Sequence, residues 1–167
     1  MITKYLSKNF YISLFVVIFI FILDRISKIY VINLNEKLIE SDLFNSTFLN
    51  ITLIWNSGIA FGLFSLSESF YYDIITLLII IIILILLIMV SKAEKFQKYS
   101  YLIIVGGGLG NLFDRIFYKA VPDFIDIHYN GFHWFIFNIA DIFITIGIIC
   151  LIYDEVFLEK NRNEHNA

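Results

Sequence analysis

The sequence predicts an all-α membrane protein in which four transmembrane helices carry a small extracytoplasmic β-sheet. The 167-residue chain is 59% hydrophobic, and only 16% of its residues are charged. A typical soluble domain is about half apolar and about a quarter charged, so this composition favours a small bundle of membrane helices. Four apolar stretches approach the length of a membrane span, and β-forming segments lie between them.

The four predicted spans cover approximately residues 10–30, 70–90, 99–117 and 136–156. Crossing the hydrocarbon layer requires about 20 mostly apolar helical residues. The second span is the most apolar, because residues 74–90 are uncharged and almost all Ile or Leu. The first stretch lacks a small-x-small cleavage site, so we interpret it as a retained span rather than a removed leader. Residues 1–167 are expected to form a single integral membrane domain.

Basic residues predict the orientation of these spans. Cytoplasmic segments of membrane proteins carry an excess of Lys and Arg. Most basic residues flank the spans on one side: Lys4, Lys8, Lys92, Lys95, Lys98, Lys160 and Arg162. Both termini are therefore predicted to be cytoplasmic, and loops 31–69 and 118–135 are predicted to face outward.

The two outer loops contain strand-like segments. Residues 47–55 (TFLNITLIW) alternate polar and apolar side chains and are rich in β-formers. Residues 122–135 are similar and contain many aromatic side chains. These pieces predict a small sheet on the membrane surface, and residues 65–72 predict an interfacial segment.

Polar residues gather near the outer ends of the spans, where charges are costly unless they are paired or functional. Asp24 and Lys28 share a helix face, and Asn111, Asp114 and Arg115 are expected to share another. A structural interpretation pairs Asp24 with Lys28 and Asp114 with Arg115. The glycines of residues 106–110 are interpreted as sites of close helix packing.

Asp123 and Asp141 differ because neither has an obvious basic partner: Asp141 has no basic residue three or four positions away, and Asp123 has only Lys119, which lies in the predicted loop. The short loop between the last two spans can bring them together. Two carboxyls in a partly dry site share a proton, which suits general acid–base hydrolysis of a peptide bond. Asp126 and Asp114 remain alternatives for either position.

Other chemistries have weaker support. Asp126, His128 and His133 match no established metal-ligand spacing, so neither a metal nor a cofactor is expected. A serine protease is disfavoured because no histidine lies inside a span. The acidic balance, with a net charge of −3, predicts no nucleic-acid partner. A proton- or cation-binding transporter and a structural adaptor remain open.

Five blocks, in order along the chain, resemble the lipoprotein signal peptidases, also called signal peptidase II. The blocks are 24–28 (DRISK), 56–62 (NSGIAFG), 107–115 (GGLGNLFDR), 121–126 (VPDFID) and 137–141 (FNIAD). The resemblance implies an aspartic endopeptidase of the bacterial cytoplasmic membrane, with its site near the outer face. Its substrates would be diacylglyceryl prolipoproteins, cut just before the lipidated cysteine. Globomycin would be an inhibitor, and we expect a monomer in contact with membrane lipid.

The resemblance also implies roles for individual residues. Asp123 and Asp141 would be the catalytic pair. The residues that line or brace the site would be Asn56, Gly58, Asn111, Arg115, Asn138 and Ala140. Asp24, Lys28 and Asp114 would be supporting polar residues. Pro122 and Ile142 depart from common family residues without removing a catalytic group.

Overall fold

The computed structural model describes residues 8–38, 42–58, 69–93 and 95–158. The elements follow in the order α1 (Lys8–Leu38), β1 (Asp42–Asn45), β2 (Leu49–Asn56), α2 (Ser69–Lys92), α3 (Lys95–Tyr118), β3 (Val121–Tyr129), β4 (Phe132–Phe137), α4 (Ile139–Tyr153) and the π-helical turn η2 (Asp154–Leu158). The predicted combination of helices and a small sheet is confirmed.

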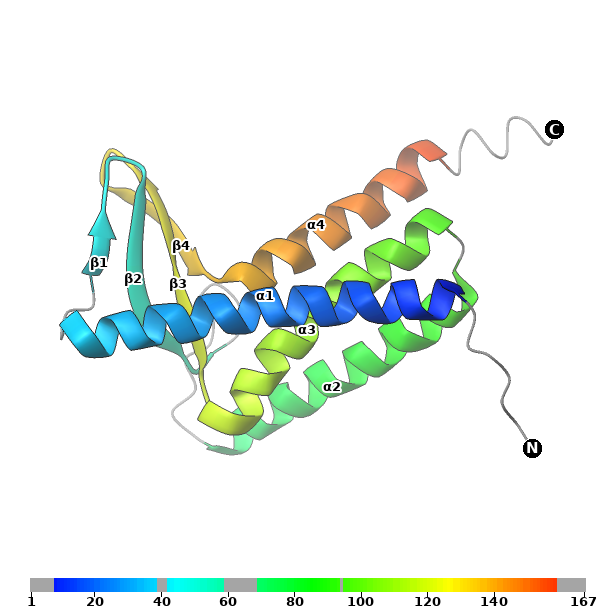
Figure 1. The fold of residues 1–167 in the computed structure, drawn as a ribbon, viewed down its shortest axis with the longest axis horizontal. Coiled ribbons are helices and arrows are strands. Elements are labelled where there is room, and N and C mark those ends of the chain that lie inside the picture. The colour runs from blue at the N-terminus through cyan, green and yellow to red at the C-terminus, as the bar shows by residue number, and fades with distance from the viewer. Residues whose placement is uncertain (1–7, 39–41, 59–68, 94, 159–167) are drawn as a thin grey trace.

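The helices are arranged around α3, which packs against α1, α2 and α4 (Figure 1). The sheet lies at one end of the bundle, and the junction of α2 and α3 lies at the other end. Among the described helices, α1 and the stretch Tyr72–Lys92 are long and apolar enough to cross a membrane. α3 carries more polar residues, and α4 is regular over only 15 residues.

Two helix boundaries differ from the sequence prediction. α1 continues to Leu38, so residues 31–38 are helical rather than part of an outer loop. This stretch contains neither glycine nor proline to end the helix. α4 begins at Ile139 because β4 extends to Phe137 and Asn138 caps the helix. The first half of the predicted interfacial segment 65–72 lies outside the described residues, and residues 69–72 begin α2.

The sheet has four antiparallel strands in the order β1-β2-β3-β4. The two predicted β-segments correspond to β2 and to the β3–β4 hairpin, whereas β1 was not predicted. Asn130 and Gly131 form the hairpin turn with φ values of 49° and 78°. An Asn-Gly pair favours this left-handed conformation, which matches the twist of the flanking strands.

A small apolar core holds the sheet against the bundle. Val31 of α1, Leu53 of β2 and Phe124 of β3 are buried together. Removing such side chains from water stabilises their contact by roughly 1.5–3 kcal/mol each. This core therefore holds β3 beside the ends of the helices.

Glycines allow α3 to approach its neighbours closely, as the sequence predicted. A Cβ atom added at Gly107 would lie 2.6 Å from the backbone oxygen of Ala140. One added at Gly110 would lie 2.5 Å from Oδ2 of Asp24. Only glycine fits these two positions without displacing α4 or the Asp24 carboxylate.

Candidate active site

A cavity of about 380 Å³ lies where α2, α3 and α4 approach the sheet. Its polar lining consists of Asn56, Asn111, Arg115, Asp123, Asn138, Asp141 and Thr145. The rest of the lining is mostly isoleucine side chains of the three helices. The cavity therefore combines two carboxyl groups with an apolar wall. We call Asp123 and Asp141 the carboxyl pair.

Asp123 is held by β3, and its residue is only 4% exposed. The Nδ2 atom of Asn138 donates a hydrogen bond to its Oδ1 at 2.6 Å, and Nδ2 of Asn56 donates to its Oδ2 at 2.9 Å. Burial, with a smaller contribution from the charge of Asp141, raises the pKa of Asp123 from 3.8 to about 6. The two amide hydrogen bonds oppose this rise but do not cancel it.

Asp141 is held by the first turn of α4. Asn138 is the N-cap residue, and its Oδ1 accepts a hydrogen bond from the backbone N–H of Asp141 at 3.2 Å. In return, Oδ2 of Asp141 accepts from the backbone N–H of Asn138 at 3.1 Å. Oδ1 of Asp141 accepts from Nδ2 of Asn111 at 2.8 Å. This reciprocal cap and the Asn111 amide fix the orientation of the carboxyl group.

Three asparagines form an amide frame around the carboxyl pair: Asn56, Asn111 and Asn138. In each, the side-chain oxygen accepts from a donor of the protein, so the NH₂ group points at a carboxyl. The donors are the backbone N–H of Gly58, Nζ of Lys28 and the backbone N–H of Asp141. The contacting donors are thus neutral amides, and none of them cancels the charge of an ionised carboxylate.

A second cluster lies beside the first and contains two cations. We call it the cation network, and it consists of Asp24, Arg25, Lys28 and Asp114. Lys28 is fully buried, and its Nζ donates to Asp24 at 2.9 Å, to Asp114 at 2.7 Å and to Asn111 at 2.8 Å. Both terminal nitrogens of Arg25 donate to the Asp114 carboxylate. The two positive and two negative charges balance.

The cation network touches the candidate site at two points. Lys28 fixes the amide of Asn111, which in turn contacts Asp141. The backbone N–H of Ala140 donates to Oδ1 of Asp24 at 3.0 Å, so Asp24 binds the first turn of α4. A carboxylate at this end of a helix is favoured by the unpaired N–H groups there.

Arg115 does not pair with Asp114, contrary to the sequence prediction. Its Nη2 donates to the carbonyl oxygen of Gly58, and its guanidinium lies 5.4 Å from the ring centre of Tyr72. Consecutive residues of a helix point in different directions, so Asp114 faces α1 while Arg115 faces the cavity. The predicted pair of Asp24 with Lys28 is confirmed.

Comparison with known proteins identifies the family. The sequence model for signal peptidase (SPase) II matches residues 16–157. The chain belongs to the signal peptidase II family. It is 51% identical over 160 residues to a lipoprotein signal peptidase of Pelagibacter ubique, covering 95% of this chain and 96% of the relative. It is 35% identical over 145 residues to one of Anaplasma phagocytophilum, covering 87% and 90%.

Solved structures agree with this family. One, a bacterial membrane enzyme determined by the in meso method at 1.9 Å, has a TM-score of 0.70 and 34% identity, covering 87% of this chain and 92% of that one. A second, at 2.3 Å, has a TM-score of 0.68, 34% identity and 90% coverage of each chain. The chain is therefore a membrane peptidase, which decides against the transporter and adaptor alternatives.

The two alternative carboxylates of this peptidase lie elsewhere. Asp114 is bound by the two cations of the network. Asp126 instead contacts His133 and Asn50 through its Oδ2, at 2.8 and 3.4 Å. Neither lines the cavity described above.

Sequence reasoning about this peptidase missed three structural roles. Arg25 was not selected as a site residue, although it donates hydrogen bonds to Asp24 and to both carboxylate oxygens of Asp114. Tyr72 donates its hydroxyl to the carbonyl oxygen of Arg115 at 3.1 Å. The spacing of Asn138 and Asp141 is that of a capping box, a signal that predicts their mutual hydrogen bonds.

Proposed function

We propose that this peptidase is an aspartic endopeptidase that removes signal peptides from diacylglyceryl-modified prolipoproteins, cutting just before the lipidated cysteine. One observation carries the catalytic type: two carboxyls line one cavity, and their donors are neutral amides. The names of the relatives support the substrate class. Asp123 and Asp141 are the proposed catalytic residues.

In the proposed mechanism, the carboxyl pair holds one proton. The ionised carboxylate takes a proton from water as the water oxygen bonds to the scissile carbonyl carbon. The protonated carboxyl donates to the carbonyl oxygen, and a neutral tetrahedral diol forms. The C–N bond then breaks as the protonated carboxyl gives its proton to the leaving amine. A hydroxyl of the diol gives its proton to the other carboxylate as the new carboxylic acid forms, so the pair again holds one proton. The raised pKa of Asp123, about 6, supports a pair that binds a proton well above the ordinary range of a carboxyl group.

The other predicted site residues have proposed supporting roles. The amide frame orients the carboxyl pair, and the Ala140 N–H ties the first turn of α4 to Asp24. Gly58 provides the carbonyl oxygen that holds Arg115 and the N–H that orients Asn56. Lys28 and Asp114 act as structural polar residues within the cation network.

The shape of the cavity supports an apolar substrate. Isoleucines of α2 and α4, including Ile79, Ile83 and Ile144, line the wall beside the polar end. The apolar helix of a signal peptide would bury its side chains against this wall. The acyl chains of the lipidated cysteine would keep the scissile bond at the membrane face. Globomycin would occupy the same cavity by family resemblance, and the enzyme would act as a monomer.

The substrate is tested by incubating purified peptidase with one precursor in diacylglyceryl-modified and unmodified forms. We expect cleavage of the modified form only, with the lipidated cysteine at the new amino terminus. Equal cleavage of both forms, or a cut elsewhere, would contradict the proposed substrate.

We also propose that all four helices span the bacterial cytoplasmic membrane, with both termini inside and the site near the outer face. The lysines at the junction of α2 and α3, at the end opposite the sheet, support this orientation (Figure 1).

Thiol labelling tests the orientation in a background where Cys150 is replaced by serine. A cysteine at Asn130, in the exposed turn of the sheet, should react with an impermeant reagent in spheroplasts. A cysteine at Lys92, exposed at the end of α2, should react only after permeabilisation. The reverse pattern would invert the proposed topology.

A further inference from the structure

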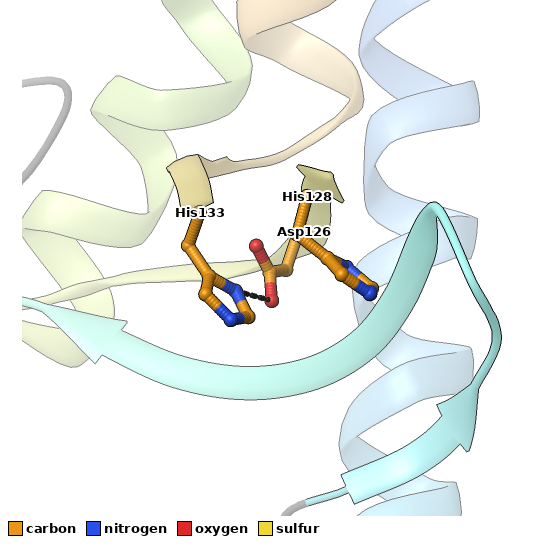
Figure 2. Close-up of side chains that lie close together, drawn as sticks. All are labelled: Asp126, His128 and His133. Carbon is orange, nitrogen blue, oxygen red and sulfur yellow. Dashed lines mark hydrogen bonds and ion pairs between the residues drawn. The ribbon is translucent and has the colours of Figure 1, made fainter. Parts of the chain in front are cut away.

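The β3–β4 hairpin carries a cluster of metal-ligating side chains outside the cavity. Asp126, His128 and His133 each offer one ligand atom, and these atoms lie within 4.8 Å of one another. Figure 2 shows the Asp126 carboxylate between the two imidazole rings. The two rings are stacked, with centres 5.0 Å apart.

Strand pairing, rather than spacing along the chain, brings these residues together. His128 and His133 are direct partners across the hairpin. A register shift lies between Asp126 and His128, where a bulge changes the direction of neighbouring side chains. Nδ1 of His133 lies 2.8 Å from Oδ2 of Asp126 as a result. The sequence argument against a ligand set considered only linear spacing and could not anticipate this register.

Two atoms of the cluster are buried without a hydrogen-bond partner among the described residues. They are Oδ1 of Asp126 and Nδ1 of His128. Asp126 is only 4% exposed, and its Oδ2 already accepts from Asn50 and contacts His133. A buried oxygen or nitrogen left without a partner is costly, and it is most often satisfied by a water or an ion. A cation bound here would coordinate ligands that otherwise lack a partner.

We propose that Asp126, His128 and His133 bind a Zn²⁺ ion on the hairpin. Two imidazoles and a carboxylate form a common zinc ligand set, and three protein ligands leave one position for water. The His133 side chain is 55% exposed, which gives the ion an entry path. The ligand atoms of tetrahedral zinc lie about 3.3 Å apart. Modest side-chain rotations would bring the three ligand atoms from within 4.8 Å of one another to this separation.

The site stabilises the hairpin and takes no part in the proposed hydrolysis. β3 also carries Asp123, and β4 leads directly into Asn138. An ion that joins the two strands therefore stiffens the two segments that hold the carboxyl pair. This inference does not depend on the proposed substrate or catalytic type.

Titration calorimetry of untagged, metal-free peptidase in detergent tests the proposal. We expect one Zn²⁺ per chain, and no comparable signal with Mg²⁺, which prefers oxygen ligands. His133→Gln and His128→Gln should each weaken zinc binding by at least about tenfold, because each removes a ligand. The matched control is His165→Gln, which removes the third histidine of the chain and should leave zinc binding unchanged.

Thermal unfolding provides a second readout that does not depend on cleavage. Zinc at roughly a hundredfold excess over its dissociation constant should raise Tm by about 5 °C in the natural sequence. The rise should disappear in His133→Gln, whose Tm without zinc also reports whether the variant folds. The proposal is overturned if the natural sequence binds no zinc, or if His128→Gln and His133→Gln bind zinc as the natural sequence does.

Discussion

Two pairs of aspartates lie side by side in this peptidase, and they differ in the charged groups that they contact. In the cation network, Asp24 and Asp114 contact the ammonium of Lys28 and the guanidinium of Arg25. In the carboxyl pair, the contacting donors are amides. The first pair contacts two cations directly, while the hydrogen bonds of the second pair come from neutral amide groups.

We propose that this difference separates a structural cluster from the catalytic pair. Removing one partner from a buried cluster of ion pairs leaves an uncompensated charge. In the proposed mechanism, a pair that contacts only neutral amides shares one proton, which it uses for acid–base chemistry. Hydrogen bonds from Lys28 to Asn111 and from Asn111 to Asp141 join the two clusters. The cation network therefore helps to orient the carboxyl pair.

The largest expected effect comes from removing either member of the carboxyl pair. Asp123→Asn and Asp141→Asn should each lower cleavage by at least about a thousandfold, because an amide can be neither the acid nor the base. Cleavage of a diacylglyceryl-modified precursor by purified variants measures this. Asp73→Asn, which alters an exposed carboxylate at the end of the bundle, should leave the rate unchanged. Near-normal turnover by either pair variant would contradict the assignment.

Removing a cation should instead affect stability. Lys28→Met leaves two buried carboxylates with one cation and should lower the free energy of unfolding by about 3–5 kcal/mol. Lys119→Met is the matched control, because its pair with Asp73 is exposed and should contribute less than about 1 kcal/mol. Thermal unfolding in detergent compares the two variants, and equal losses would show that the network is not a scaffold.

The raised pKa of Asp123 predicts a pH-dependent stability difference. Between its ordinary pKa of 3.8 and its folded pKa of about 6, the folded state binds more protons than the unfolded state. Stability from this group is therefore present at low pH and is lost as pH rises through that window. Asp123→Asn lacks this loss, so its Tm relative to the natural sequence should increase from pH 4 to pH 7, by an equivalent of about 3 kcal/mol. A constant difference would contradict the raised pKa.

Substitution of the glycines of α3 is expected to have a smaller effect on stability. Gly107→Ala would place a Cβ 2.6 Å from the Ala140 carbonyl oxygen and should destabilise the fold by about 1–3 kcal/mol. Gly108→Ala meets Ile83 at an ordinary 3.4 Å and should be neutral or stabilise the helix by up to about 1 kcal/mol. Thermal unfolding should therefore show a lower Tm for Gly107→Ala than for Gly108→Ala, and equal Tm values would contradict the close packing at Gly107.

The elements of the fold that depend on local sequence could be predicted. Apolar runs predicted the helices, and β-forming residues predicted β2 and the β3–β4 hairpin. β1 was missed because four residues (DLFN) carry too little periodicity. The end of α1 was also missed, because nothing in residues 31–38 distinguishes a helix that leaves the bundle from a loop.

The candidate site was predictable only in part. Asp123 and Asp141 were selected because neither has a basic partner within a predicted helix, but pairing across helices could not be derived from spacing. Asp114 contacts Arg25 and Lys28 because α1 packs against α3, which reverses the expected pairing with Arg115. The orientation of each asparagine amide depends on donors from other elements. These contacts depend on tertiary packing, which the sequence pattern does not reveal.

One comparison tests the central claim most directly: the same Asp→Asn change made in each cluster, with cleavage and Tm measured side by side at neutral pH. For Asp123→Asn, we predict loss of cleavage with an unchanged or higher Tm. For Asp114→Asn, which leaves two buried cations with one carboxylate, we predict a lower Tm. The account would be contradicted if Asp123→Asn kept its cleavage activity, or if it lowered Tm as much as Asp114→Asn.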